Sequence, residues 1–321
     1  MPSRPAVLVT RKLPDAVTKR LLVTYKARTN AEDNLYSAAD LLAKAAGADA
    51  LLPCPTDKLT AEVIDALPDS VRIISTFSVG HEHIDLDRAR RRGIVVTNTP
   101  DVLTDATADI ALLLILGAAR RAHEGEAMVR QAGWGAWAPT GMLGIHVTGK
   151  RLGILGMGRI GQAVAQRARG FNMTIHYSNR RRLPAELEHG ANYHASADEM
   201  LPNCDFLSIN TPATPETYHF LDERRIGLLP DGAVVVNTAR GTVVDDAALI
   251  AALKSGKLAA AGLDVFEGEP NINPAYRPLT NTFLLPHLGS ATHETRNAMG
   301  FKCLDNLDAF FAGREPPDRV A

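Results

Sequence analysis

The sequence predicts an α/β fold with two parallel-sheet domains, the second inserted into the first. Apolar strands alternate with helical stretches over residues 6–97 and again over residues 151–285, and this alternation is typical of parallel sheets. A glycine-rich strand–turn–helix motif stands near the middle of the 321 residues, so another domain precedes it. A long amphipathic helix at residues 292–311 follows the last strand, and we expect it to pack back on the first domain.

The first alternating series contains five expected strands and four expected helices. The helix at residues 86–92 ends in arginines and Gly93, which is a basic last turn followed by a glycine cap. No glycine fingerprint occurs in this series, so we do not place a dinucleotide site there. The strands are expected at residues 6–9, 23–28, 50–52, 71–75 and 94–97, and the other helices at residues 15–22, 38–46 and 61–66.

A long apolar helix and a loop are expected between the two series. The helix spans residues 106–123, and its apolar run over residues 110–119 is shorter than the ~20 residues that cross a bilayer. We therefore expect a buried helix and no membrane element. The loop, at residues 133–149, is rich in Gly and Trp.

The second series opens with the motif Gly156-Met-Gly158-Arg-Ile-Gly161, between an apolar strand at residues 151–155 and a helix at residues 159–169. This is the G-x-G-x-x-G pattern of a Rossmann-like dinucleotide-binding domain. Gly156 forms the tight turn, Gly158 lets the backbone approach the pyrophosphate, and Gly161 permits close packing of helix on strand. Five further strands are expected at residues 173–177, 205–209, 233–237, 260–263 and 282–285.

The late position of this motif predicts how the domains are connected. The cofactor domain, residues 103–287, would interrupt a flavodoxin-like substrate-binding domain made of residues 1–102 and 288–321. The two crossings, near Pro100 and Gly289, would form a hinge. A cleft between hinged domains is a common place for a ligand site.

The strand after the motif indicates which dinucleotide binds. NAD sites usually carry an acid about 20 residues after the motif, which binds the ribose 2′-OH, but no acid occurs between Gly161 and Glu186. Arginines follow the strand instead, and arginine makes charge-assisted, bidentate bonds to phosphate. We predict NADP(H) as the preferred cofactor, with NAD(H) as the alternative. The 2′-phosphate contacts are assigned to Asn179 and Arg180, with Arg181 or Ser178 in support.

Three later strand ends supply an Arg, a carboxylate and a His, namely Arg240, Glu269 and His287. The carboxyl ends of parallel strands lie at one edge of the sheet, where ligands bind, so we expect these side chains to converge. An Arg can hold a 2-oxo acid, a His can protonate its carbonyl oxygen as hydride arrives, and a carboxylate can orient that His. The set predicts an oxidoreductase of small 2-oxo acids, and we expect no metal.

Composition excludes several other classes of protein. The formal net charge of −1 gives no overall field that favours nucleic acid or an anionic membrane, so we expect neither partner. Cys54, Cys204 and Cys303 fit no disulfide framework or metal spacing, and we expect small buried side chains. The first five residues lead into a strand without an apolar signal segment, so we expect a cytoplasmic protein.

Together the motifs resemble the D-isomer-specific 2-hydroxyacid dehydrogenases over nearly the whole chain. The segments that begin at Phe77 (Phe-Ser-Val-Gly), Thr99 (Thr-Pro-Asp-Val-Leu-Thr-Asp), Gly133 (Gly-Trp-Gly-Ala-Trp) and His287 (His-Leu-Gly-Ser-Ala-Thr) are most similar to glyoxylate/hydroxypyruvate reductases. The resemblance implies NADPH-dependent reduction of glyoxylate or hydroxypyruvate to D-2-hydroxy acids, with His287 as general acid. It also implies a homodimer, with a dimerisation segment around residues 106–148.

The resemblance assigns further residues by position. The catalytic Arg, Glu and His of the family fall on Arg240, Glu269 and His287, and a formate-dehydrogenase-type site would carry Gln in place of Glu269. The expected substrate contacts are Val79 and Gly80 through their amides, Arg240, His287, Ser290, and Trp137 from the partner subunit, unless Trp137 serves interface packing alone. The further cofactor contacts are Thr107, Arg159, Ile160, Thr211, Pro212, Thr238, Ala239, His287, Gly289, and Asp264 as acceptor of the nicotinamide amide.

Two other functions stay open. A nucleotide-sensing corepressor on the same fold can retain the Arg–Glu–His set, although the basic turn and the lack of appended polar tails argue against it. A D-lactate or D-3-phosphoglycerate dehydrogenase is the other alternative, which the missing regulatory domain and the NADP-type turn weaken. The preferred 2-oxo acid stays open too, because all of them share the carboxylate and carbonyl that these residues would hold.

Overall fold

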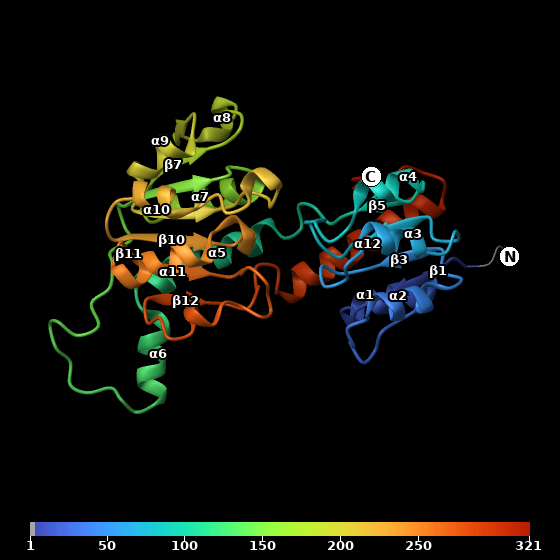
Figure 1. The fold of residues 1–321 in the computed structure, drawn as a ribbon, viewed down its shortest axis with the longest axis horizontal. Coiled ribbons are helices and arrows are strands. Elements are labelled where there is room, and N and C mark those ends of the chain that lie inside the picture. The colour runs from blue at the N-terminus through green and yellow to red at the C-terminus, as the bar shows by residue number, and fades with distance from the viewer. Residues whose placement is uncertain (1–3) are drawn as a thin grey trace. The chain divides into compact units, whose positions relative to one another are not determined.

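The computed structural model describes residues 4–321, which form two compact units (Figure 1). The first unit runs up to Leu103 and resumes over Thr292–Ala321, and the second is Thr104–Ala291. The expected boundary after residue 287 falls four residues before this division, because the buried carboxylate of Asp264 binds the amides of the following loop and keeps it in the second unit. Residues 1–3, on which the expected absence of a signal segment partly rests, lie outside the described residues.

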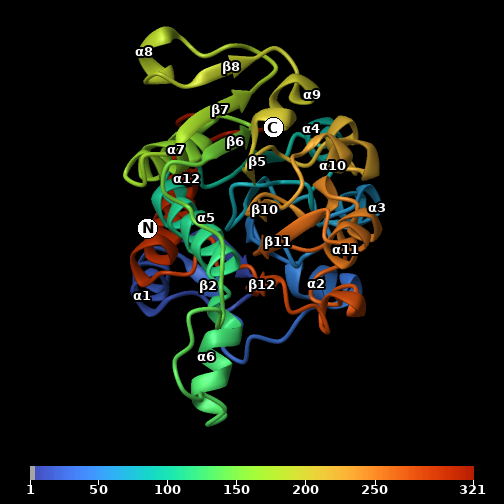
Figure 2. The ribbon, with the colours of Figure 1, turned by 90° about the vertical axis from the view of Figure 1, so that its left-hand side faces the viewer.

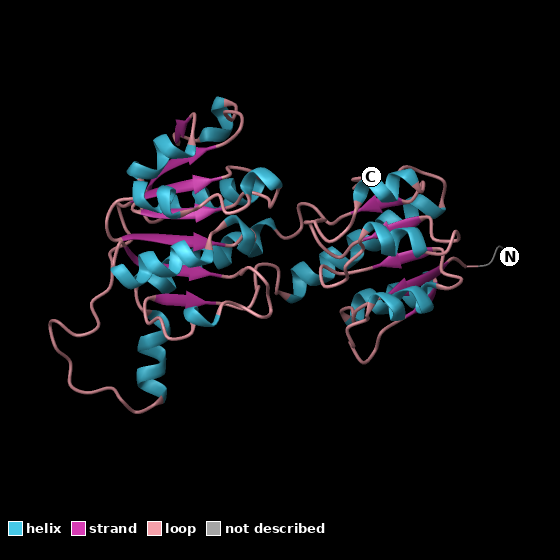
Figure 3. Cartoon of the chain, in the orientation of Figure 1, coloured by secondary structure: helices cyan, strands magenta, loops and turns pink. Residues whose placement is uncertain are grey.

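The first unit is a five-stranded parallel sheet with helices on both faces (Figure 3). Its strands are β1 (Ala6–Val9), β2 (Lys26–Arg28), β3 (Ala50–Leu52), β4 (Ile73–Ser75) and β5 (Val95–Thr97). Its helices are α1 (Asp15–Thr24), α2 (Ala38–Ala45), α3 (Ala61–Ala66), α4 (Leu86–Arg91) and α12 (His293–Phe311). The strand order β2-β1-β3-β4-β5 is the flavodoxin-like order, as the sequence predicts.

Successive side chains of these strands enter two separate cores. Leu8, on β1, packs with α2, α3 and α4, whereas its neighbours Val7 and Val9 pack with α1 and α12. The last helix therefore covers the first sheet, as expected. The strand expected at residues 23–28 is shorter, because α1 continues to Thr24 and the amide of the buried Tyr25 still bonds to the carbonyl of Leu21.

The second unit is a seven-stranded parallel sheet in the order β12-β11-β10-β9-β6-β7-β8. Its strands are β6 (Arg151–Leu155), β7 (Thr174–Ser178), β8 (Asn192–His194), β9 (Phe206–Ile209), β10 (Ala233–Asn237), β11 (Leu258–Leu263) and β12 (Thr282–Leu284). Its helices are α5 (Thr104–Ala119), α6 (Ala122–Arg130), α7 (Arg159–Arg169), α8 (Ala185–Glu188), α9 (Ala197–Met200), α10 (Glu223–Leu228) and α11 (Asp246–Ser255).

This is a Rossmann-type arrangement, in which the strand order reverses between β6 and β9. Ligands of open α/β sheets bind at such a reversal, outside the carboxyl ends of the strands. The edge strand β8 is absent from the sequence-based prediction, because its three residues are partly exposed and carry no apolar run.

The single helix expected at residues 106–123 is wrong. The chain forms α5 and then α6, and the break falls at Arg121, whose φ of 54° is left-handed and ends the α-helical path. Helix α5 packs on α7 and on the strands β10 and β11, which accounts for its apolar composition. No helix among the described residues is long and apolar enough to cross a membrane.

Figures 1 and 2 show α6 and the loop after it projecting from the sheet of the second unit. Helix α6 has no buried residue. The side chains of Trp134 and Trp137, in the loop, are 70% and 82% exposed. These two side chains therefore contribute little to the packing of the second unit.

Candidate active site

The glycine motif forms the turn from β6 into α7. Gly156 has a φ of 92°, and a Cβ on it would lie 2.9 Å from the backbone of Asn210, so the turn lies directly on the end of β9. A Cβ on Gly161 would lie 2.3 Å from the Gly156 carbonyl oxygen. Gly158 caps the N-terminus of α7, yet a Cβ there would meet no atom within 4 Å. The motif thus leaves an open cradle before a helix N-terminus, which fits a pyrophosphate.

Within residues 4–321, two buried polar atoms that follow strands of the second sheet have no hydrogen-bond partner, namely Thr238 Oγ1 after β10 and Asn210 Oδ1 after β9. Buried polar groups are almost always paired, so each atom is suited to a ligand that supplies the missing bond. Thr238 is among the predicted cofactor contacts, whereas Asn210 is not. Asn210 stands directly after a central strand and before the predicted contacts Thr211 and Pro212. This position in the sequence could have identified it as a further candidate contact.

In the basic turn after β7, residues 178–182, some side chains bind other parts of the protein and others are exposed to solvent. The Asn179 side chain accepts a hydrogen bond from the Met157 amide, with 2.6 Å between Oδ1 and N. Because a backbone N–H can only donate, Oδ1 is fixed on the glycine motif and Nδ2 is the atom left for a ligand. Arg180 and Arg181 are exposed. Ser178 is buried, and its carbonyl accepts from Gly156.

Arg182, the third arginine of this turn, is bound within the protein instead. It forms two hydrogen bonds to Glu188, at 2.8 and 3.0 Å, and the buried Tyr177 hydroxyl donates to the same carboxylate. The bonds from Arg182 and Tyr177 lower the pKa of Glu188 to about 2 although the residue is buried, so this carboxylate stays ionised at neutral pH. The network anchors the far end of the basic turn.

Arg240, Glu269 and His287 converge at the carboxyl edge of the second sheet. His287 Nδ1 lies 2.7 Å from Glu269 Oε1. The Glu269 side chain is 36% exposed, and its partial burial raises the pKa, but the hydrogen bond and charge of His287, together with the charge of Arg240, bring the pKa below its usual value. The ionised carboxylate can only accept, so Nδ1 carries a proton and Nε2 is the nitrogen left for a substrate.

The Arg240 loop is shaped by Asn237, which is 1% exposed. The Asn237 side chain accepts from the Ala239 amide and donates to the Arg240 carbonyl, both at 2.9 Å. A Cβ on Gly241 would lie 1.8 Å from the Phe266 carbonyl carbon, so this loop rests directly on the loop that carries Glu269. Asn237 and Gly241 are positioning residues that the sequence-based prediction does not include.

The His287 loop is held by Asp264, which is 1% exposed. Its carboxylate accepts from the amides of Leu288 and Gly289, at 2.6 and 2.8 Å, and its carbonyl accepts from the His287 amide. The Thr107 hydroxyl donates to the Gly289 carbonyl. Three predicted cofactor residues, Asp264, Gly289 and Thr107, are thus brought together, although both carboxylate oxygens of Asp264 already bind backbone amides.

In the first unit, the segment with Val79 and Gly80 has its carbonyls turned inward. The Asn98 side chain donates to the Val79 carbonyl at 2.8 Å, and the Ser78 hydroxyl donates to the Gly80 carbonyl at 2.6 Å. Within residues 4–321, neither the Val79 nor the Gly80 amide has a hydrogen-bond acceptor. Two neighbouring free amides are suited to an anion.

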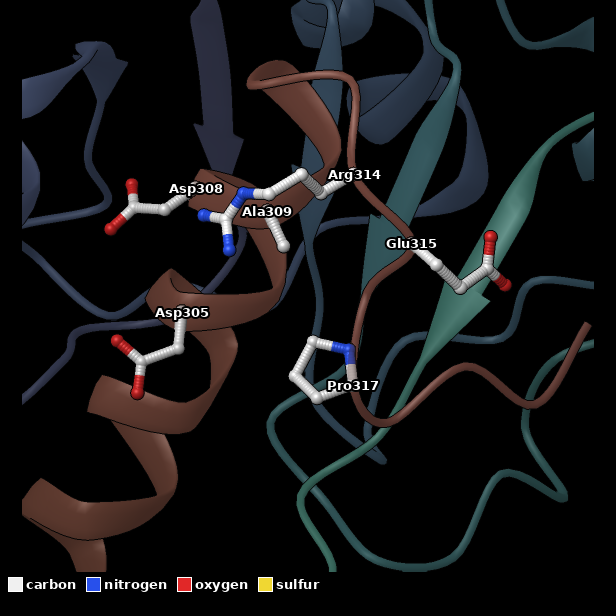
Figure 4. Close-up of a pocket in the computed structure, with 6 residues that line it drawn as sticks. All are labelled: Asp305, Asp308, Ala309, Arg314, Glu315 and Pro317. Carbon is white, nitrogen blue, oxygen red and sulfur yellow. The ribbon is translucent and has the colours of Figure 1, made fainter.

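Figure 4 shows a different hollow of the first unit, at the end of α12, with a volume of about 400 Å³. It is lined by Asp305, Asp308 and Glu315 beside Arg314, and it contains none of the predicted site residues. Arg20 pairs with both aspartates, so this acidic surface serves the packing of α1 on α12. Its charge does not suit an anionic acid.

Comparison with known proteins agrees with this geometry. Residues 112–289 match the family described as "D-isomer specific 2-hydroxyacid dehydrogenase, NAD binding domain". The chain is 45% identical to glycerate dehydrogenase of Hyphomicrobium methylovorum, over 98% of each chain, and 45% identical to glyoxylate reductase of Thermococcus litoralis, over 99% of this chain and 97% of the relative.

A solved structure is similar over the whole chain as well. The NADPH-dependent glyoxylate/hydroxypyruvate reductase of Sinorhizobium meliloti, in complex with NADP and malonate, is 36% identical, with a TM-score of 0.89 over 99% of this chain and 97% of that one. The protein belongs to the D-isomer-specific 2-hydroxyacid dehydrogenase family.

Proposed function

We propose that the protein is an NADPH-dependent reductase of small 2-oxo acids, which converts glyoxylate and hydroxypyruvate to the corresponding 2-hydroxy acids, of D configuration where the product is chiral. The observation that carries this proposal is the 2.7 Å bond between His287 and Glu269 beside Arg240. The names of the similar reductases from Thermococcus and Sinorhizobium support the substrate class.

Each residue of the set has one task in this mechanism. The bound nicotinamide supplies the hydride. Arg240 holds the substrate carboxylate or carbonyl oxygen, and the free amides of Val79 and Gly80 bind the carboxylate. His287 donates the proton of Nε2 to the carbonyl oxygen, and Glu269 keeps the ring oriented. In the reverse direction the same nitrogen removes that proton.

The proposed cofactor contacts all lie in the second unit. The cradle at Gly158 would receive the pyrophosphate, and the Asn179 amide nitrogen with Arg180 and Arg181 would bind the 2′-phosphate. Asp264 would accept from the nicotinamide amide through its remaining lone pairs. The other proposed contacts are Thr107, Gly156, Arg159, Ile160, Gly161, Ser178, Thr211, Pro212, Thr238, Ala239, His287 and Gly289, and Ser290 would contact the substrate.

Replacement of His287 tests the acid–base role. We expect His287→Ala to lower kcat by about 10²- to 10⁴-fold, because general acid catalysis contributes about that factor. The NADPH dissociation constant, measured by fluorescence titration, should change little. His293→Ala, on an exposed residue that begins α12, is the control and should keep full turnover. Unchanged turnover in His287→Ala would remove the residue from the mechanism.

Cofactor preference tests the basic turn. We expect the double variant Asn179→Asp/Arg180→Ala to shift kcat/KM towards NADH by about tenfold or more, because it introduces a charge that repels phosphate and removes a charged hydrogen bond. Arg90→Ala is the control, since Arg90 is an exposed arginine of α4 that pairs with Asp87, and its loss should leave the NADPH/NADH ratio unchanged. Equal efficiency of the wild type with both cofactors would contradict the proposal.

Substitutions of Gly158 and Gly161 distinguish a glycine that leaves room for a ligand from one that allows close packing within the protein. We expect Gly158→Ala to keep the wild-type melting temperature, because its Cβ meets no protein atom, yet to weaken NADPH binding at least tenfold, because the Cβ fills the cradle. Gly161→Ala should lower the melting temperature, since its Cβ collides with the Gly156 carbonyl. Calorimetry and cofactor titration measure both. Full NADPH affinity in Gly158→Ala would refute the cradle.

We also propose a homodimer formed through α6 and the loop after it, with Trp137 closing the partner's pocket. The exposed apolar side chains of this segment support it, among them Val129 at 62% and Leu143 at 64%. Sedimentation equilibrium should give twice the chain mass of 34.5 kDa. The variant Val129→Asp/Leu143→Asp should sediment as a monomer, and a wild-type mass of one chain would sink the idea.

A further inference from the structure

Three loops of the second unit meet at His219, a residue to which the proposed reaction assigns no role. Its amide donates to the Thr242 carbonyl at 2.8 Å, in the loop after β10. Its Nε2 lies 2.9 Å from Glu267 Oε2, in the loop after β11, and its Nδ1 lies 4.0 Å from Asp245. His219 itself belongs to the loop after β9. One residue therefore ties together the loops that carry Thr211, Arg240 and Glu269.

The part of the loop after β11 that carries Glu269 is exposed. Phe266 is buried, but Gly268 and Glu269 are exposed, and Gly268 has a φ of 72°. The second oxygen of Glu269 accepts from the Phe266 amide at 3.4 Å, which is long for a hydrogen bond. Glu267 joins this loop to the loop after β9, where its carboxylate accepts from His219 and, at 3.3 Å, from the Tyr218 hydroxyl.

His219 is itself held in an unusual conformation. Its φ of 47° is left-handed, which costs free energy in a residue with a Cβ and persists where the surroundings enforce it. The Tyr218 ring stacks on the imidazole, with centroids 4.0 Å apart and an angle of 15° between the planes. The stacked Tyr218 ring and the Glu267 carboxylate hold the imidazole, and the Thr242 carbonyl holds the backbone amide of the same residue.

We propose that His219 and Glu267 form a positioning pair that keeps the Glu269 carboxylate against His287 Nδ1. Neither residue of the pair is assigned a contact with substrate or cofactor. Glu269 stands two residues after Glu267, with a glycine between, so a loop released at Glu267 can move its carboxylate away from the imidazole. This inference rests on the proposed function, in which Glu269 orients the acid.

The test compares His219→Ala, His219→Gln and Glu267→Gln with the wild type. We expect His219→Ala to lower kcat by about 10- to 100-fold, because small displacements of catalytic groups cost that much, and to change the NADPH dissociation constant by less than about threefold. His219→Gln, which can still donate to Glu267, should recover part of the loss. If Glu267→Gln and His219→Ala act through one contact, the double variant should lose little more than the worse single variant.

His189→Ala is the matched control, because His189 also has a φ of 47° but is exposed at the end of α8, and this variant should keep full kcat. A wild-type kcat in both His219→Ala and Glu267→Gln would overturn the pair. The pair would also be overturned if the fold losses of kcat in the two single variants multiplied in the His219→Ala/Glu267→Gln double variant, because two residues that act independently give that result.

The ¹⁵N resonances of His287 separate this inference from the proposed function, because they report its bond to Glu269 whether or not the protein reduces 2-oxo acids. We expect them to change in His219→Ala and to return towards wild type in His219→Gln. A wild-type protein without turnover but with these changes would sink the proposed function and leave the pair standing. Unchanged resonances in folded His219→Ala would sink the pair.

Discussion

The arrangement of the candidate active site depends on one buried carboxylate. Asp264 follows β11 directly and is almost fully buried, and burial of a charged group is costly unless it is hydrogen-bonded. Burial raises its pKa, against the amides of Leu288 and Gly289 and the charge of His287, which favour the ionised form. If the loop after β12 moved away, the buried Asp264 carboxylate would lose the two amides that bind it. Asp264 therefore fixes the left-handed backbone of His287, whose φ is 56°, and presents the Gly289 carbonyl to Thr107.

Close approaches between backbones extend this constraint to the other loops. Gly156 lies against the end of β9, and Gly241 lies against Phe266, at distances that a side chain would not allow. Each contact joins segments that follow different strands of one parallel sheet. The Arg240 and Glu269 loops are thus in direct contact, and the glycine turn contacts the start of the loop after β9, which also carries His219. Through such contacts a residue can influence a side chain that it does not touch.

The sequence predicts those parts of the structure that depend on local pattern or on strand direction. The turn at Gly156 and the convergence of Arg240, Glu269 and His287 were predictable, because parallel strands bring their carboxyl ends to one edge. Contacts between distant loops were not. Nothing near Asn237 or His219 in the sequence indicates that one shapes the Arg240 loop and the other binds Glu267. The edge strand β8 and the break at Arg121 also escaped prediction, since neither has an apolar pattern or a glycine to mark it.

The two ends of the Asn179 amide have different roles: Oδ1 accepts a hydrogen bond within the protein, and Nδ2 is left for the proposed ligand. The bond from the Met157 amide requires an oxygen at this position, and an aspartate would supply it as well as the asparagine does. The hydrogen bond to the glycine motif therefore does not explain why this residue is an asparagine and not an aspartate. The two residues differ in the second atom, which is a donor in asparagine and a charged acceptor in aspartate. An asparagine therefore adds no negative charge beside the exposed Arg180, and the proposed preference for NADP(H) rests on these two side chains.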